Sequence, residues 1–189
     1  MGIEELHQKI TLEEFIESEK TSEVPLEFID GYLIAKCFSS MVHNKIVLRI
    51  SSEIDRYLRK KPCEVFSEQI EVILGDDRVK PDVFVVCKKE NENFKKIGQS
   101  FLSIPDFVFE VVSPSNAGLD TITKMELYAK CGIKEYNLVY QEGMIHQYVL
   151  NEFGSYYPKN SYKNSDVYKS YVLEELEIDM DFIFEDLEF

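Results

Sequence analysis

The stretch from Phe107 to Val139, FVFEVVSPSNAGLDTITKMELYAKCGIKEYNLV, decides the fold. Its first residues, FVFEVV, form a short run of apolar, β-branched and aromatic side chains, which predicts a buried strand ending after Val112. A helix over 121–130 follows, with Asp120 as its expected N-cap, and a second strand begins at Glu135. The stretch therefore predicts a strand, a helix and a strand in succession.

Two carboxylates accompany the predicted buried strands. Glu110 interrupts the first run and shares one strand face with Val108 and Val112. A carboxylate in such a place is costly unless it is paired or holds a metal. Upstream, Asp82 follows Pro81 and directly precedes VFVVC, a second run typical of a buried strand. Two neighbouring strands of this kind can bring the two carboxylates together.

Lys124, on the first turn of the predicted helix, adds a cation to this acidic pair. Magnesium prefers oxygen ligands from one or two carboxylates, with water and substrate phosphate completing its shell. Asp82 and Glu110 would supply the carboxylates, and Lys124 would hold the attacking water and offset charge on the phosphate. A turn residue is the alternative for Asp82, and an i+4 ion pair with Asp120 is the alternative for Lys124. Together the three residues favour a metal site.

The motifs in chain order resemble the Uma2 family (DUF820), predicted endonucleases of the PD-(D/E)XK restriction-endonuclease-like superfamily. The resemblance extends from about Thr11 to near the C-terminus. One departure is that Val112 stands where the superfamily pattern places a lysine, and Lys124 on the following helix takes its place. The residues that carry the resemblance are Pro81-Asp82, the run from Glu110 to Ser115, Asp120, Lys124, Tyr128, Gly132 and Glu135-Tyr136, with LEFIDG at 26–31 and His43 upstream.

The resemblance implies an α/β restriction-endonuclease-like fold, with a central mixed sheet flanked by helices, an added N-terminal hairpin and a site at one sheet edge. It implies a Mg²⁺-dependent DNA endonuclease, with Mn²⁺ able to substitute. Asp82, Glu110 and the backbone carbonyl of Val111 would be the metal ligands, and Lys124 would be catalytic. Glu27, on the hairpin, would border the active site, and an exposed strand residue is its alternative. A homodimer is expected by analogy, because cutting both strands calls for two sites.

A basic helix is the candidate contact for nucleic acid. Apolar residues at i+4 spacing from Val42 to Leu58 predict an amphipathic helix. Residues 36–61 carry seven lysines and arginines against two acids, and a solvated helix face is the alternative reading. His43 matches the family, with a structural hydrogen-bonding role as its alternative. The candidate nucleic-acid contacts are His43, Lys45, Arg49 and Arg56.

The overall composition predicts a single globular domain over residues 1–189, with 44% hydrophobic and 30% charged residues. The formal charge of −14 argues against loose, non-specific binding to DNA. Two other readings therefore stay open. One is an inactive nuclease-fold protein that binds nucleic acid or a protein partner, and the other is a hydrolase of another phosphate ester.

The four cysteines, Cys37, Cys63, Cys87 and Cys131, are scattered without the spacing of a zinc site. They are expected to be reduced, mostly buried thiols. The first residues lack the pattern of a secretory signal, and no apolar run approaches the roughly 18 residues of a membrane span. A cytoplasmic protein that does not contact the membrane is the expectation.

Overall fold

The structure is a computed structural model that describes residues 9–36, 39–68, 70–87, 96–97, 100–113 and 117–187. The helical elements are α1 (Leu12–Thr21), α2 (Met41–Leu58), the π-helical η2 (Leu119–Lys124), α3 (Met125–Cys131) and α4 (Met180–Phe184). The strands are β1 (Leu26–Ile29), β2 (Tyr32–Ala35), β3 (Cys63–Ser67), β4 (Val72–Leu74), β5 (Asp77–Val79), β6 (Val83–Cys87), β7 (Lys96–Ile97), β8 (Ser100–Phe101), β9 (Phe107–Val112), β10 (Glu135–Tyr140), β11 (Met144–Leu150), β12 (Tyr156–Lys163), β13 (Val167–Lys169) and β14 (Glu177–Asp179).

Two six-stranded sheets form the framework. The first has the order β2-β1-β5-β4-β8-β7, and the second has the order β12-β11-β10-β9-β6-β3. In the second sheet β9 and β10 are parallel, while the other neighbours are antiparallel. The expected mixed sheet flanked by helices is confirmed.

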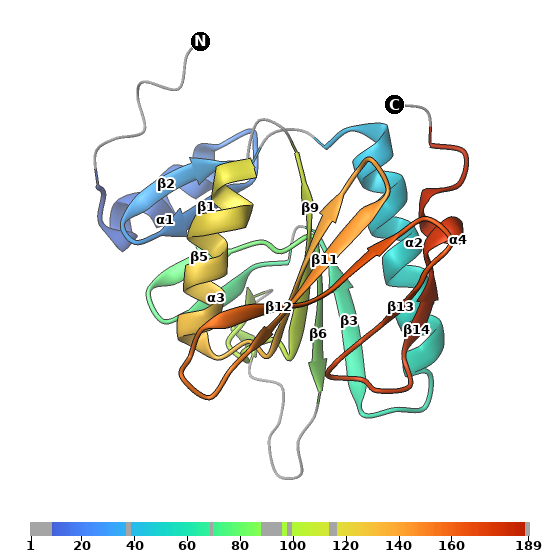
Figure 1. The fold of residues 1–189 in the computed structure, drawn as a ribbon. Helices are drawn as coiled ribbons and strands as arrows, with labels where there is room; N and C mark the ends of the chain where they lie inside the picture. Colours follow the sequence, from blue (N-terminus) through green and yellow to red (C-terminus); the bar gives the residue numbers. More distant parts are fainter. Residues whose placement is uncertain are drawn as a thin grey trace.

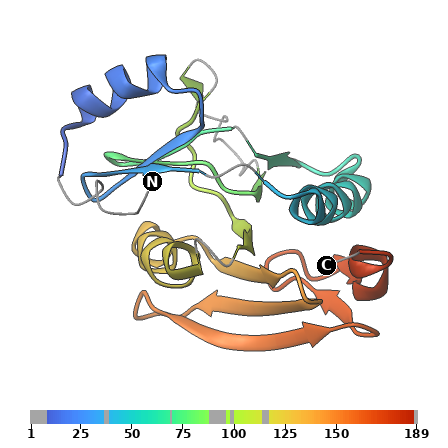
Figure 2. The ribbon, with the colours of Figure 1, turned by 90° about the horizontal axis from the view of Figure 1, so that it is seen from above.

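The second sheet lies between two different layers (Figures 1 and 2). On one face, β9 residues such as Phe109 and Val111 share a core with α2, α4 and the small β13-β14 ribbon. On the other face, Val108 and Val112 share a core with α3 and strands of the first sheet. The predicted alternation along β9 is thus confirmed, and Glu110, between Val108 and Val112, is on the face toward α3.

The predicted N-terminal hairpin is confirmed as β1 and β2. The turn between them is Asp30-Gly31, with φ of 50° at Asp30 and 83° at Gly31. Two positive φ values in a two-residue turn match the twist of the flanking strands, which is why Asp-Gly is favoured there. The hairpin places Glu27 on a strand next to β5.

The helix after β9 differs from the prediction. Residues 117 and 118 are already helical, and Leu119–Lys124 forms a π-helical segment that continues into α3. Asp120 is therefore a buried residue inside the helix, and the expectation that it caps the N-terminus is wrong. A π-helical turn widens the helix by one residue, a feature that is frequent at functional sites. Here Asp120 and Lys124 are both buried within the π-helical segment.

The expectation of reduced cysteines is wrong for one pair. Cys63 on β3 lies opposite Cys87 on β6, and the two form a disulfide. They are separated by 24 residues in sequence, so no local sequence motif predicted that they would pair. Cys131 is a free, partly buried thiol, and Cys37 lies outside the described residues. Within the described ranges, no helix is long and apolar enough to span a bilayer.

Candidate active site

Strand register brings Asp82 and Glu110 together. β6 and β9 are antiparallel, with Val83 opposite Phe109. Continuing this register by one residue sets Asp82 across from Glu110. The backbone N–H of Val111 donates a hydrogen bond to Asp82 Oδ2 at 2.8 Å, which fixes the carboxylate at this point. The site therefore lies at the ends of two interior strands, rather than on an outer strand of the sheet.

Asp82 is a buried, ionised carboxylate with its own cation. Lys36 Nζ donates to Asp82 Oδ1 at 2.9 Å and to the carbonyl of Lys80 at 2.8 Å. Burial acts to raise the pKa of Asp82, but the Lys36 ammonium and the His43 side chain outweigh it, and the pKa falls below its ordinary value. Asp82 is therefore charged across the physiological pH range.

Glu110 is buried on the α3 side of the sheet, and two donors reach the same oxygen. Lys124 Nζ donates to Glu110 Oε1 at 3.1 Å, and the Tyr128 hydroxyl donates to it at 2.7 Å. Burial raises the pKa of Glu110 from 4.5 to about 8, opposed by Lys124 and reinforced by Asp82. Without a further cation, this carboxyl therefore binds a proton more readily than an exposed glutamate.

Lys124 is deeply buried, with a side chain that is only 1% exposed. Its Nζ lies 3.1 Å from Glu110, 3.2 Å from Glu27 and 3.7 Å from Asp120. Burial acts to lower the pKa of Lys124, but these carboxylates raise it well above its usual range. Lys124 is a fixed positive charge and a hydrogen-bond donor, and it is not a base.

Glu27 lies beside Lys124 and is completely buried. The backbone N–H of Lys80 donates to Glu27 Oε1 at 2.6 Å. Glu27 Oε2 is buried and accepts no hydrogen bond from any residue that the structure describes. Glu27 is therefore not an exposed strand residue. Its Oε2 is able to accept a hydrogen bond.

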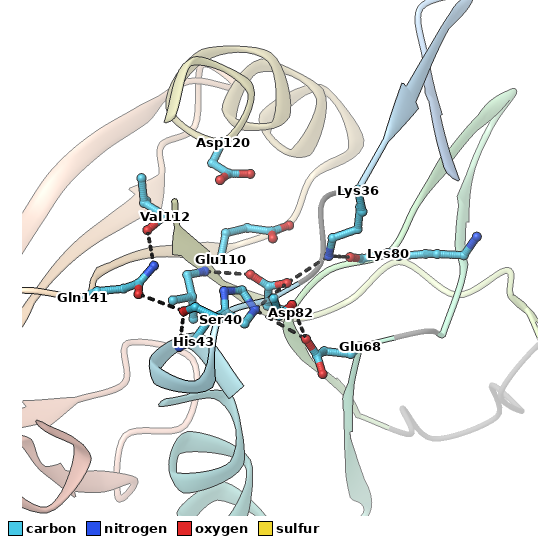
Figure 3. Close-up of polar contacts among 12 residues, drawn as sticks. Lys36, Ser40, His43, Glu68, Lys80, Asp82, Glu110, Val112, Asp120 and Gln141 are labelled. Atoms are coloured by element: carbon cyan, nitrogen blue, oxygen red, sulfur yellow. Dashed lines mark hydrogen bonds and ion pairs between the residues drawn. The ribbon is translucent and has the colours of Figure 1, made fainter. Parts of the chain in front are cut away.

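Two residues near Asp82 were not singled out from the sequence. Lys36 was counted only as part of a basic stretch, and Glu68 was not considered. His43 Nε2 lies 3.4 Å from Glu68 Oε1 and 3.5 Å from Asp82 Oδ1, whereas Lys36 contacts Asp82 directly. In Figure 3 Glu110 and Asp120 lie above the Asp82 carboxylate, and His43 and Glu68 lie below it. No sequence signal identifies Glu68, because it reaches Asp82 through strand pairing of β3 with β6.

The charge balance of this cluster fits a divalent cation. Among the described residues, two ammonium groups, Lys36 and Lys124, face five carboxyl groups. Burial raises the pKa of one of these carboxyls, Asp120, to about 6, with Lys124 opposing the rise. A buried excess of carboxylate oxygen is what a hard cation such as Mg²⁺ binds. The five carboxyl groups are those of Glu27, Glu68, Asp82, Glu110 and Asp120.

The residues of α2 that were predicted to contact nucleic acid differ in how exposed they are to solvent. Lys45 is exposed, and Arg56 is exposed and paired with Glu53 one turn earlier. Arg49 is partly buried, and its Nη1 donates to the backbone carbonyls of Ile183 at 3.0 Å and of Glu185 at 2.8 Å. Arg49 thereby links α2 to the C-terminal segment. His43 is buried in the acidic cluster.

A known protein family matches most of this chain. The model of the Uma2 family, described as "Putative restriction endonuclease", matches residues 12–181. The chain belongs to the Uma2 family. The Uma2 match includes the hairpin with Glu27, the Asp82 and Glu110 strands, and the helix with Lys124.

Two proteins from Synechocystis sp. (strain ATCC 27184 / PCC 6803 / Kazusa) are similar to this chain. The chain is 28% identical to "Uncharacterized protein slr1290" over 123 residues, 64% of this chain and 63% of that protein. It is also 28% identical to "Uncharacterized protein sll1609" over 142 residues, 70% of this chain and 75% of that protein. The match thus spans less than two thirds of slr1290.

A solved structure shares the fold of this Uma2 chain. It is the crystal structure of "a putative nuclease belonging to DUF820" from Anabaena variabilis ATCC 29413, with a TM-score of 0.73 and 22% sequence identity. The alignment covers 93% of this chain and 97% of the Anabaena chain. At 22% identity, this likeness shows a shared fold.

Proposed function

We propose that this protein is a Mg²⁺-dependent endonuclease that hydrolyses phosphodiester bonds in DNA. The observation that carries the proposal is the convergence of Asp82, Glu110, Lys124 and Glu27 in one buried cluster of a Uma2 chain. A fold that only binds a partner gains nothing from several buried carboxylates, because their burial is costly without a counterion. The cluster is therefore better explained by chemistry than by stability.

Asp82, Glu110 and the carbonyl of Val111 would hold the cation. The N–H and the carbonyl of one strand residue point to the same side, and the Val111 N–H already binds Asp82. Continuing the register sets Pro81 opposite Val111, and proline has no N–H to donate to the Val111 carbonyl. When bound, Mg²⁺ lowers the pKa of an attacking water and neutralises charge on the phosphate.

Lys124 would position the reacting groups through its fixed charge. Its ammonium is held on Glu110 and Glu27, so it offers a fixed positive charge to an attacking water at the cation. The free Oε2 of Glu27 can accept a hydrogen bond from that water. Tyr128 keeps the Glu110 carboxylate oriented through its 2.7 Å hydrogen bond.

A cleavage assay tests the proposal. Purified protein is incubated with supercoiled plasmid, single-stranded RNA or nucleotides, with Mg²⁺ or with EDTA. Plasmid nicking that requires Mg²⁺ and is lost in Asp82→Asn and Glu110→Gln is the expected result. Asp106→Asn is the matched control, since Asp106 is also buried but binds the Cys87 N–H and lies outside the cluster.

Three outcomes would contradict the proposal. Cleavage of RNA alone would change the substrate, and turnover of nucleotides alone would favour the hydrolase of another phosphate ester. Binding of DNA without cleavage at any Mg²⁺ or Mn²⁺ concentration would favour an inactive nuclease fold.

A further inference from the structure

We infer that His43, Glu68 and Asp82 form a second divalent-cation site, one that selects a transition-metal ion such as Mn²⁺. This inference deepens the proposed nuclease function, because Asp82 belongs to both positions. It stands on the geometry of three side chains from separate elements: His43 from the first turn of α2, Glu68 from the end of β3 and Asp82 from the start of β6.

The distances suit first-row metal coordination. His43 Nε2 lies 3.4 Å from Glu68 Oε1 and 3.5 Å from Asp82 Oδ1, and the three ligand atoms lie within 4.8 Å of one another. Such ions hold imidazole nitrogen and carboxylate oxygen at about 2.0–2.2 Å, so that neighbouring ligand atoms are about 3.0–3.5 Å apart. Both distances from His43 already match that separation.

The ring nitrogen of His43 faces both carboxylates of this cluster. The residue is 7% exposed, and its Nε2 is buried without a hydrogen bond of acceptable geometry to any described residue. A buried ring nitrogen left in this state costs free energy, and a metal ion aligned with it removes the cost. The Ser40 hydroxyl caps α2 by accepting a hydrogen bond from the His43 backbone N–H at 3.0 Å, which fixes the helix turn that carries the ring.

Glu68 is also fixed toward the site. Its backbone N–H donates to the Asp82 carbonyl at 3.1 Å, and the Ser39 hydroxyl donates to Oε1 at 3.1 Å. Its φ of 33° lies in the left-handed region, which is unfavourable for a residue with a side chain. Side chain and backbone together hold the carboxylate beside His43.

The mixed donor set determines the kind of ion. Mg²⁺ and Ca²⁺ prefer oxygen ligands throughout, whereas imidazole nitrogen suits the first-row transition metals. One nitrogen and two carboxylate oxygens therefore favour Mn²⁺ over Mg²⁺ at this position, while the oxygen-only position at Glu110 accepts either ion. Lys36, on the same Asp82 oxygen, would weaken binding and keep it reversible.

Electron spin-echo spectroscopy of bound Mn²⁺ tests the inference, because it detects a nitrogen ligand directly. The Mn²⁺-loaded parent protein should show coupling to one imidazole ¹⁴N, and the coupling should vanish in His43→Ala. His146→Ala is the matched control and should keep the coupling, since His146 lies on β11, edge-to-face with Tyr140 of β10 and outside the cluster. Glu68→Gln should weaken Mn²⁺ binding at least about tenfold.

No ¹⁴N coupling in the parent, or coupling that persists in His43→Ala, would overturn the inference. Glu68→Gln provides a second test if His43→Ala fails to fold, because the Glu68 side chain is 30% exposed and its replacement should be tolerated. Unchanged Mn²⁺ affinity in Glu68→Gln would also count against the site. All readouts are binding measurements without nucleic acid. A protein that shows the coupling but does not cleave DNA would retain this site and lose the proposed function.

Discussion

Replacing Lys124 with methionine probes the buried cluster without shortening the side chain. The change removes an ammonium that lies 3.1 Å from Glu110 and 3.2 Å from Glu27, and both carboxylates are at most 1% exposed. Removing one partner of a buried ion pair typically costs roughly 3–5 kcal/mol, because the remaining charge is left without compensation. At about 2–4 °C per kcal/mol for a domain of this size, the melting temperature should fall by about 6–20 °C.

Urea unfolding in EDTA measures the effect on the free energy of unfolding. Lys130→Met is the matched control, because Lys130 is exposed on the same helix and its loss should change stability by no more than about 0.5 kcal/mol. The double variant Lys124→Met/Glu110→Gln should recover part of the loss, since it removes one of the unpaired carboxylates. A loss below about 1 kcal/mol in Lys124→Met would refute the reasoning that this lysine neutralises the buried acids.

Three further predictions concern charge in and around the site. Burial raises the pKa of Glu110 from 4.5 to about 8, so in EDTA the free energy of unfolding should fall as pH rises through that interval, and thermal melts of Glu110→Gln should show a smaller fall. Lys36→Met should tighten Mn²⁺ binding in a calorimetric titration, because it removes the positive charge from Asp82 Oδ1, and weaker binding would contradict this arrangement. Lys45→Glu should weaken DNA binding in a salt series more than Lys159→Glu, and equal effects would make α2 an ordinary solvated helix.

Residues with a local signature could be predicted from the sequence. Glu110 stood out because a carboxylate inside an apolar strand needs a partner, and the structure gives it two donors. The hairpin turn at Asp30-Gly31 followed from the conformations these two residues tolerate. The apolar stripe of α2 followed from its period, and Ile46, Ile50 and Ile54 are fully buried.

Residues that depend on non-local pairing could not be predicted. Lys36 and Glu68 reach Asp82 only after strands far apart in sequence have paired, so neither carries a signal of its own. The disulfide depends on the same pairing of β3 with β6. Arg49 was predicted to contact phosphate because it lies in a basic stretch. Its partners are backbone carbonyls beyond residue 180, and a pattern of charged residues cannot reveal such partners.

The helix that carries Lys124 shows an intermediate case. The presence of a helix was correctly predicted, but its start was placed too late because Asp120 resembles an N-cap. The π-helical turn is a departure from regular geometry that the sequence pattern does not encode. Asp120 and Lys124 are both buried within this segment.

The central claim is that the buried acids around Asp82 hold divalent cations, and a crystal soaked in Mn²⁺ tests it most directly. An anomalous difference map should show a peak at about 2.0–2.2 Å from an oxygen of Asp82, with Glu110 or the pair of His43 and Glu68 as the neighbouring ligands. A map with no peak at Asp82, under Mn²⁺ concentrations that support cleavage in solution, would contradict the account.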